Sequence, residues 1–131
     1  MADLLNKTNA LIAAAAVGNL TNVKRIIKNG MDIDVQSQAG FTALIESSYY
    51  GHQKIVKWLV ENGANLNLQD THGWTAAISA MYSEELEVLK FLIDSGADTS
   101  IPDNKNNTVL SIASDHGQYE VIKWIVVKEN K

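Results

Sequence analysis

Apolar residues return at helical spacing in several stretches of the chain, and each stretch ends at a glycine. One such face is formed by Ile55, Val56, Leu59 and Val60, and Gly63 follows it. Positions three and four residues apart lie on one side of a helix, so this spacing predicts an amphipathic helix. Glycine tolerates the positive φ that commonly ends a helix. A short helix of this kind needs a packing partner to cover its apolar face.

A second helix is predicted just before the first. Thr42 stands where a helix would begin, and its hydroxyl can accept a hydrogen bond from a free amide of the first turn. Ser47 and Ser48 are small enough for close helix packing, and Gly51 ends the segment. Residues 40–67 therefore form one unit, a short helix pair followed by a turn.

The same unit recurs every 33 residues along the chain. Three glycines and three threonines follow this period, as do three apolar columns of the second helix: Gly30, Gly63, Gly96; Thr42, Thr75, Thr108; Val23, Val56, Leu89, Ile122; Ile26, Leu59, Leu92, Ile125; and Ile27, Val60, Ile93, Val126. Units that cannot bury their own faces form a core by stacking. We expect an all-α solenoid of units at about 4–36, 37–69, 70–102 and 103–131, the first and last acting as caps.

The repeats resemble the ankyrin family. The family's pattern of Gly-x-Thr, Gly-His, Val-x-x-Leu-Leu and Gly-Ala-Asp is matched by Gly40-Phe-Thr, Gly51-His52, Ile55-Val56 with Leu59-Val60, and Gly63-Ala64-Asn65, and returns as Gly73-Trp-Thr75 and Gly96-Ala97-Asp98. The resemblance implies helix pairs joined by hairpin-like turns, and a surface that binds other proteins. Fold alone does not identify the partner.

The third unit departs from this pattern. Glu84 and Glu85 stand where the other units have Gly-His or a related pair. Because glutamate disfavours a positive φ, we expect this turn to adopt another conformation or the helix before it to run further. The last helix departs too, since Val127 occupies a position that earlier units fill with Lys28, Glu61 or Asp94. That apolar end motivates an alternative function, a self-assembling structural or scaffold protein.

Composition excludes several classes of protein. The 131 residues contain no cysteine, so disulfides, thiolate zinc sites and cysteine nucleophiles are absent. One arginine and a net charge of −4 argue against nucleic-acid binding. The apolar run 10–17 is too short to span a membrane, and it falls within the repeat rather than standing as a signal peptide. We expect a cytoplasmic monomer without membrane attachment.

Catalytic and metal-ligating patterns are missing. The three histidines, His52, His72 and His116, fall at turns, and none has a partner at metal-ligand spacing. The glycines follow the repeat and form no phosphate loop. We therefore expect no enzyme activity, catalytic residue, metal or cofactor, and a ligand-binding or catalytic domain is the least favoured alternative.

The candidate partner-binding residues lie where the units differ most, at the turns and at the ends of the first helices. In the resembling family these positions face a concave groove. Tyrosine and tryptophan are common at the centres of protein interfaces. The candidates are Phe41, Tyr49, Tyr50, His72, Trp74, Tyr82, Glu84, Glu85, Lys105, Asn107, Asp115 and His116. Three further aromatics, Trp58, Phe91 and Trp124, share one column of the second helix and are predicted to lie in the core between units.

Charge is distributed unevenly along the chain. Residues 1–67 carry a net charge of +1 and residues 68–131 a net charge of −5, with six acidic residues between Tyr82 and Asp103 inclusive. Acidic groups beside an aromatic surface would attract a basic protein. The sequence therefore predicts a non-enzymatic module that recognises, sequesters or inhibits a partner protein. One concrete form is the neutralisation of a toxin or enzyme.

Overall fold

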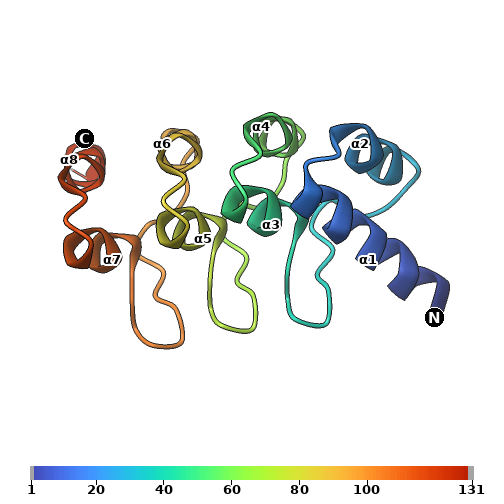
Figure 1. Cartoon of the computed structure of the whole chain (residues 1–131), viewed down its shortest axis with the longest axis horizontal. Coiled ribbons are helices and arrows are strands. Elements are labelled where there is room, and N and C mark those ends of the chain that lie inside the picture. Colours follow the sequence, from blue (N-terminus) through green and yellow to red (C-terminus); the bar gives the residue numbers. More distant parts are fainter. Residues whose placement is uncertain (1, 130–131) are drawn as a thin grey trace.

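The computed structural model describes residues 2–129, and helices are the only regular elements in this range. Four pairs follow one another along the molecule (Figure 1). Their bounds are α1 Ala2–Val17, α2 Leu20–Lys28, α3 Ala43–Tyr49, α4 Gln53–Glu61, α5 Ala76–Tyr82, α6 Leu86–Asp94, α7 Val109–Asp115 and α8 Tyr119–Glu129. The all-α repeat solenoid predicted from the 33-residue period is confirmed.

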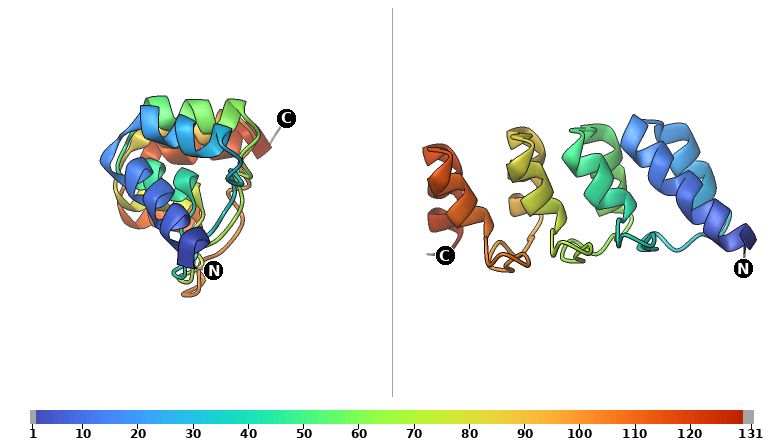
Figure 2. Two further views of the ribbon diagram at one scale, coloured as in Figure 1. Left: turned by 90° about the vertical axis from the view of Figure 1, so that its right-hand side faces the viewer. Right: turned by 60° about the horizontal axis from the view of Figure 1, so that its bottom comes forward.

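The helices form two layers. The odd-numbered helices lie side by side in an inner layer, the even-numbered helices lie above them, and long loops project from the other side (Figures 1 and 2). Contacts run from each helix to its pair and to the neighbouring helix of its own layer, as in α1·α3, α3·α5 and α5·α7. The predicted unit boundaries stay a prediction, and the last of them, residue 131, lies outside the described residues.

One continuous apolar core runs the length of the stack. The inner helices contribute small residues, including Ala43, Ala76 and Ala77, all at most 1% exposed. The outer helices contribute larger side chains such as Leu59 and Leu89, both fully buried. Small residues let the inner helices approach closely, and each unit covers the apolar face of the next. The run 10–17 lies within α1, where Leu11, Ala14 and Ala15 join this core while Val17 is 75% exposed.

The inner helices begin at the predicted threonine caps. Thr42 Oγ1 accepts a hydrogen bond from the Ile45 amide at 3.0 Å, and Thr75 Oγ1 accepts one from the Ile78 amide at 3.2 Å. An N-cap of this type contributes about 0.5–2 kcal/mol to stability. The pattern of threonines therefore fixes where each inner helix starts.

The expectation of an irregular turn at Glu84 is wrong. Glu84 has φ +58°, in the same left-handed region as Gly51 at +75° and Gly117 at +67°. Helix α5 also has seven residues, as α3 and α7 do. The packing of the two helix layers imposes this backbone conformation on glutamate, although left-handed backbone costs an L-residue roughly 1–2 kcal/mol.

Hydrogen bonds join successive loops into a ladder. Gln36 Nε2 donates to the Gln69 carbonyl at 3.0 Å, and Gln69 Nε2 donates in turn to the Pro102 carbonyl at 3.0 Å. The Thr71 amide also donates to the Ala39 carbonyl at 3.0 Å. Each loop is therefore held against the next one, and the surface that the loops build is a fixed one.

Three aromatic residues of the outer helices lie at the edge of the core. Trp58, Phe91 and Trp124 pack against it but are only half-buried.

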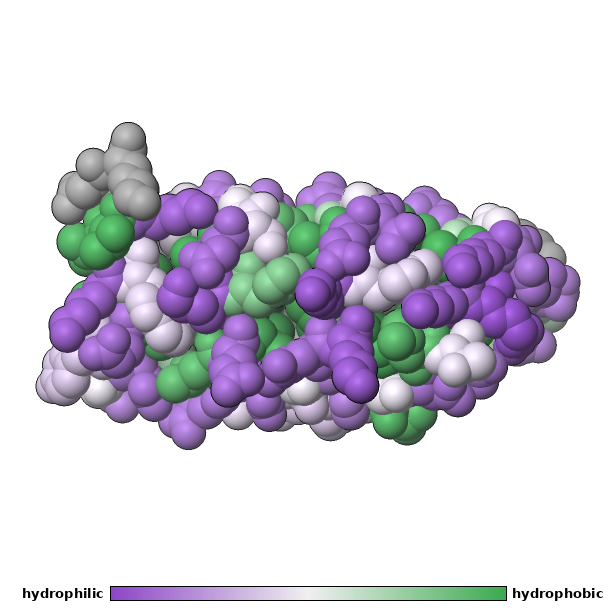
Figure 3. Space-filling view, turned by 90° about the horizontal axis from the view of Figure 1, so that it is seen from above, coloured by the Kyte–Doolittle hydropathy of each residue, from purple (hydrophilic) through white to green (hydrophobic). Residues whose placement is uncertain are grey.

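The surface of the outer layer is mostly hydrophilic (Figure 3). Val126 and Val127 on α8 are 44% and 57% exposed. Within residues 2–129, no helix combines the length and apolar character needed to cross a membrane.

Candidate functional site

Four aromatic side chains form a continuous row across the second and third units. Tyr50 meets Tyr49 edge to face with ring centroids 5.0 Å apart. Tyr49 stacks on Trp74 at 6.4 Å, and Trp74 stacks on Tyr82 at 4.7 Å. We call Tyr50, Tyr49, Trp74 and Tyr82 the aromatic row. Stacked rings hold one another in place, so the row presents a large and rigid surface.

The fold explains why these rings meet. Tyr49 is the last residue of α3 and Tyr50 follows it, so neither ring is drawn into the core; they are 37% and 52% exposed. Trp74 directly precedes the cap of α5, and Tyr82 is the last residue of that helix. Because α3 and α5 are neighbours in the inner layer, the end of one helix comes beside the other helix and the loop that precedes it.

The loop between α6 and α7 anchors Tyr82. Its hydroxyl donates to Asp103 Oδ2 at 3.3 Å and accepts from Asn107 Nδ2 at 3.2 Å. Burial and the nearby Asp103 carboxylate raise the pKa of Tyr82. Burial alone would raise the pKa of Asp103, but hydrogen bonds from the Asn107 and Lys105 amides and the Tyr82 hydroxyl outweigh it and lower that pKa.

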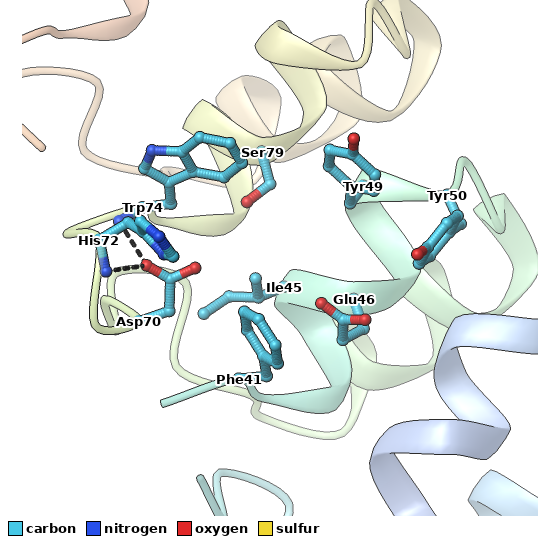
Figure 4. A pocket seen from close by; sticks show the side chains of 9 residues that line it. All are labelled: Phe41, Ile45, Glu46, Tyr49, Tyr50, Asp70, His72, Trp74 and Ser79. Carbon is cyan, nitrogen blue, oxygen red and sulfur yellow. Dashed lines mark hydrogen bonds between the residues drawn. The ribbon is translucent and has the colours of Figure 1, made fainter. Parts of the chain in front are cut away.

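A hollow of about 220 Å³ opens beside the row. Phe41, Tyr49, Tyr50, His72 and Trp74 form its aromatic walls (Figure 4). Four more residues complete the lining, and they come from α3, from α5 and from the loop between α4 and α5: Ile45, Glu46, Asp70 and Ser79. We call this hollow the aromatic pocket. Ligand pockets for small molecules usually measure roughly 300–1,000 Å³, so this one suits a single side chain better than a cofactor.

Two carboxylates give the aromatic pocket its charge. Asp70 is 7% exposed, and its Oδ1 accepts hydrogen bonds from the His72 amide at 2.8 Å and the Trp74 amide at 3.0 Å. These bonds fix the loop that carries both aromatic residues. Glu46 lies across the pocket on α3, and its pKa is raised by burial and by the charge of Asp70. The pocket therefore holds negative charge that no described residue neutralises.

The structure brings together seven of the twelve predicted partner-binding residues. Five line the aromatic pocket, and Tyr82 with Asn107 extends the surface toward the fourth unit. Glu84 and His116 form a separate contact, with Glu84 Oε1 at 3.9 Å from His116 Nδ1.

The other three predicted residues lie apart from the pocket. Glu85 packs over Gly51, where a Cβ would lie 2.3 Å from Glu85 Oε2. Lys105 is exposed in the next loop, and Asp115 ends α7 close enough to Tyr82 to contribute to the raised pKa of that tyrosine. They flank the aromatic row rather than join the pocket.

The sequence comparison of units missed Glu46, Asp70 and Ser79. Glu46 shares its repeat position with Ala13, Ser79 and Ile112, and this variation in the middle of the inner helix was the signal that could have found it. The prediction considered only turns and helix ends.

Most of the acidic run between Tyr82 and Asp103 lies away from the pocket. Glu87 and Asp94 lie on the outer helix α6, where they contact Gln53 at 2.7 Å and Lys90 at 2.9 Å. Asp103 is the member of the run that contacts the aromatic row, through Tyr82, and Glu46 and Asp70 supply the charge in the pocket.

The rest of the described surface offers a larger hollow but no metal site. Across residues 2–129, no group of three histidines, aspartates or glutamates is placed to hold a metal ion. A larger hollow of about 570 Å³ lies at the N-terminal end, between α1, α2 and the first loop. Its lining includes Lys7 and Arg25 but none of the predicted residues. The aromatic pocket is therefore the better candidate.

Comparison with known families gives a match over the whole chain. The family model described as "Ankyrin repeats (3 copies)" matches residues 1–70 and again residues 62–131. The search among curated proteins found no match.

Proposed function

Because the chain belongs to the ankyrin-repeat family, whose members serve as protein–protein interaction modules, we propose that it binds one partner protein through the concave face of its second to fourth units. The aromatic row forms the centre of this face. The partner carries a basic surface, and binding holds, sequesters or inhibits it. Covering the active site of a toxin or enzyme is one form that such inhibition takes.

The observation that supports this proposal most is the aromatic row itself. Four aromatic rings in mutual contact, two of them on residues more than one-third exposed, lie on one face of a rigid stack. Interfaces draw most of their affinity from a few such aromatic residues near the centre. The loop ladder adds to this because a surface that is already ordered loses little entropy on binding.

Capture from a lysate of the native host tests the proposal. The wild-type chain and a variant with Tyr50→Ala, Trp74→Ala and Tyr82→Ala are used in parallel, followed by mass spectrometry. We expect the variant to lose the specific partner. Circular dichroism checks that it keeps its helices, since Trp74 and Tyr82 are half-buried. A milder variant, Tyr50→Ala with His72→Ala, removes two exposed rings and should weaken capture without threatening the fold.

The matched control changes exposed residues of the other layer. Tyr119 is 72% exposed and Val127 is 57% exposed, both on α8. A chain with Tyr119→Ala and Val127→Ala should capture the partner as well as wild type does. We call the triple variant and the milder double variant the groove variants. Undiminished capture of the partner by folded groove variants would disprove the proposed surface.

Self-association through the last helix is the second candidate function. The exposed Val126 and Val127 side chains favour it, since exposed apolar residues at the end of a repeat array attract a further unit. Light scattering separates the two functions. A monomer at high protein concentration supports partner binding, whereas a wild-type oligomer that Val127→Ala dissociates supports assembly.

A further inference from the structure

The aromatic pocket has a chemistry that the aromatic row alone does not explain. Its walls are aromatic, yet two carboxylates and a buried hydroxyl point into it from three different elements (Figure 4). Glu46 comes from α3, Asp70 from the loop between α4 and α5, and Ser79 from α5. An apolar anchor such as leucine would cover these polar groups without offering Ser79 Oγ or Asp70 Oδ2 a hydrogen-bond donor, which is costly.

Ser79 contributes an unpaired polar group to the pocket. Its side chain is fully buried, and Oγ has no hydrogen-bond partner among the described residues. Buried hydroxyls are nearly always paired in folded proteins. Figure 4 shows this hydroxyl pointing into the space between Asp70 and the rings, where an incoming donor would meet it.

Asp70 offers a second open acceptor. One oxygen is engaged by two amides of its own loop, whereas no described residue donates to Oδ2, which points into the pocket. The equivalent aspartate one unit later, Asp103, uses its Oδ2 to accept from Tyr82. Tyr49 occupies the position equivalent to Tyr82, but its hydroxyl points away from Asp70. Asp70 of the third unit therefore keeps open an acceptor that Tyr82 fills on Asp103 of the fourth unit.

We propose that the aromatic pocket binds one arginine side chain of the partner, and this inference rests on the proposed function. The guanidinium group would donate to Asp70 Oδ2, the Glu46 carboxylate and Ser79 Oγ while its flat face lies against the aromatic walls. Arginine suits the pocket better than lysine. Its donors spread in a plane and reach acceptors on several walls, and the plane stacks on aromatic rings. A cation also relieves the repulsion between the two carboxylates.

Titration with short peptides, followed by NMR, tests this inference. The probe is acetyl-Gly-Ser-Arg-Ser-Gly-amide, and the matched peptides carry lysine or the neutral isostere citrulline instead of arginine. We expect saturable shifts of the Trp74 indole N–H and of amides in 70–79, with Trp58 and Trp124 as internal references. Citrulline should bind at least about tenfold more weakly, because a charge-assisted hydrogen bond is roughly twice as strong as a neutral one. Lysine should bind several-fold more weakly than arginine.

Two serines provide a matched pair of variants. Ser48 Oγ is also buried without a partner, but Ser48 does not line the pocket. Ser79→Ala should weaken arginine binding several-fold, and Ser48→Ala should leave it unchanged, while neither lowers the melting temperature. Glu46→Gln should weaken binding by about tenfold.

Several outcomes would overturn the arginine site: no saturable shift, equal binding of the citrulline or lysine peptide, or an unchanged affinity in both Ser79→Ala and Glu46→Gln. These results would leave the proposed function standing as long as the groove variants still lose the partner. Undiminished capture by those variants removes the proposed function whatever the peptides do.

Discussion

Replacing Gly40 with alanine should destabilise the protein far more than the same change at Gly63. Both glycines have a positive φ, +80° and +90° respectively. A Cβ at Gly40 would lie 2.8 Å from Asp70 Cα and 3.0 Å from the Thr71 amide nitrogen, whereas a Cβ at Gly63 meets nothing within 4 Å. The pair therefore separates the contact between loops from the backbone conformation.

The magnitudes follow from these two contributions. The left-handed backbone conformation destabilises the folded state of an alanine variant by roughly 1–2 kcal/mol. Alanine also lowers the entropy of the unfolded chain, which offsets about 0.4–1 kcal/mol of that loss in stability. Gly63→Ala should thus lose about 0.5–1 kcal/mol. Overpacking against a backbone that cannot move adds about 1–3 kcal/mol, so Gly40→Ala should lose about 2–4 kcal/mol.

Urea unfolding followed by circular dichroism measures the loss of unfolding free energy in each variant. An unchanged m-value shows that the compactness of the two states and the two-state transition are preserved. A second consequence concerns the pocket, because the alanine at position 40 presses on the loop that carries Asp70. Gly40→Ala should therefore weaken arginine-peptide binding, and Gly63→Ala should not. Equal destabilisation by the two variants would refute the close packing of successive loops.

Three further predictions concern charge and backbone strain. Burial and the charge of Asp70 raise the pKa of Glu46 in the folded protein. Between the unfolded and the folded pKa of Glu46, the folded state therefore binds more protons, and stability falls as the pH rises through that range. Glu46→Gln should raise the melting temperature at neutral pH and reduce the fall in stability with pH. Asp103 has a lowered pKa, so its contribution is present above its unfolded pKa and lost as pH falls through its folded pKa. Tyr82→Phe, which removes one of its hydrogen bonds, should cost about 1 kcal/mol at neutral pH and less in acid, as measured by urea unfolding. Glu84→Gly should add about 0.5–1 kcal/mol in the same assay by relieving the φ of +58°.

The repeat period predicted the fold because its signals are local. Thr42 caps a helix through a hydrogen bond three residues away, and Ile55 and Leu59 face the core through helical spacing alone. The left-handed conformation of Glu84 could not be predicted in this way. It is imposed by the turn between two packed layers, and the identity of the residue argues against it.

The aromatic row was predictable and the pocket was not. Tyr49, Tyr50 and Trp74 stand at turns and helix ends, where differences between units show which residues face outward. The pocket is a space left between the packed side chains of α3, α5 and the loop before α5. Asp70 and Asp103 hold their own loops by the same bonds, yet only Asp103 receives a tyrosine hydroxyl. A difference in ring orientation of this kind is a property of packing, which the repeat pattern does not encode.

Hydrogen–deuterium exchange of the chain, alone and in complex with the captured partner, tests the central claim most directly. If the concave face is the binding surface, protection should appear in the loops and inner helices at 37–50 and 70–83, and α8 should exchange as it does in the free chain. Protection confined to the outer helices α4, α6 and α8, with 37–50 and 70–83 unchanged, would contradict the account.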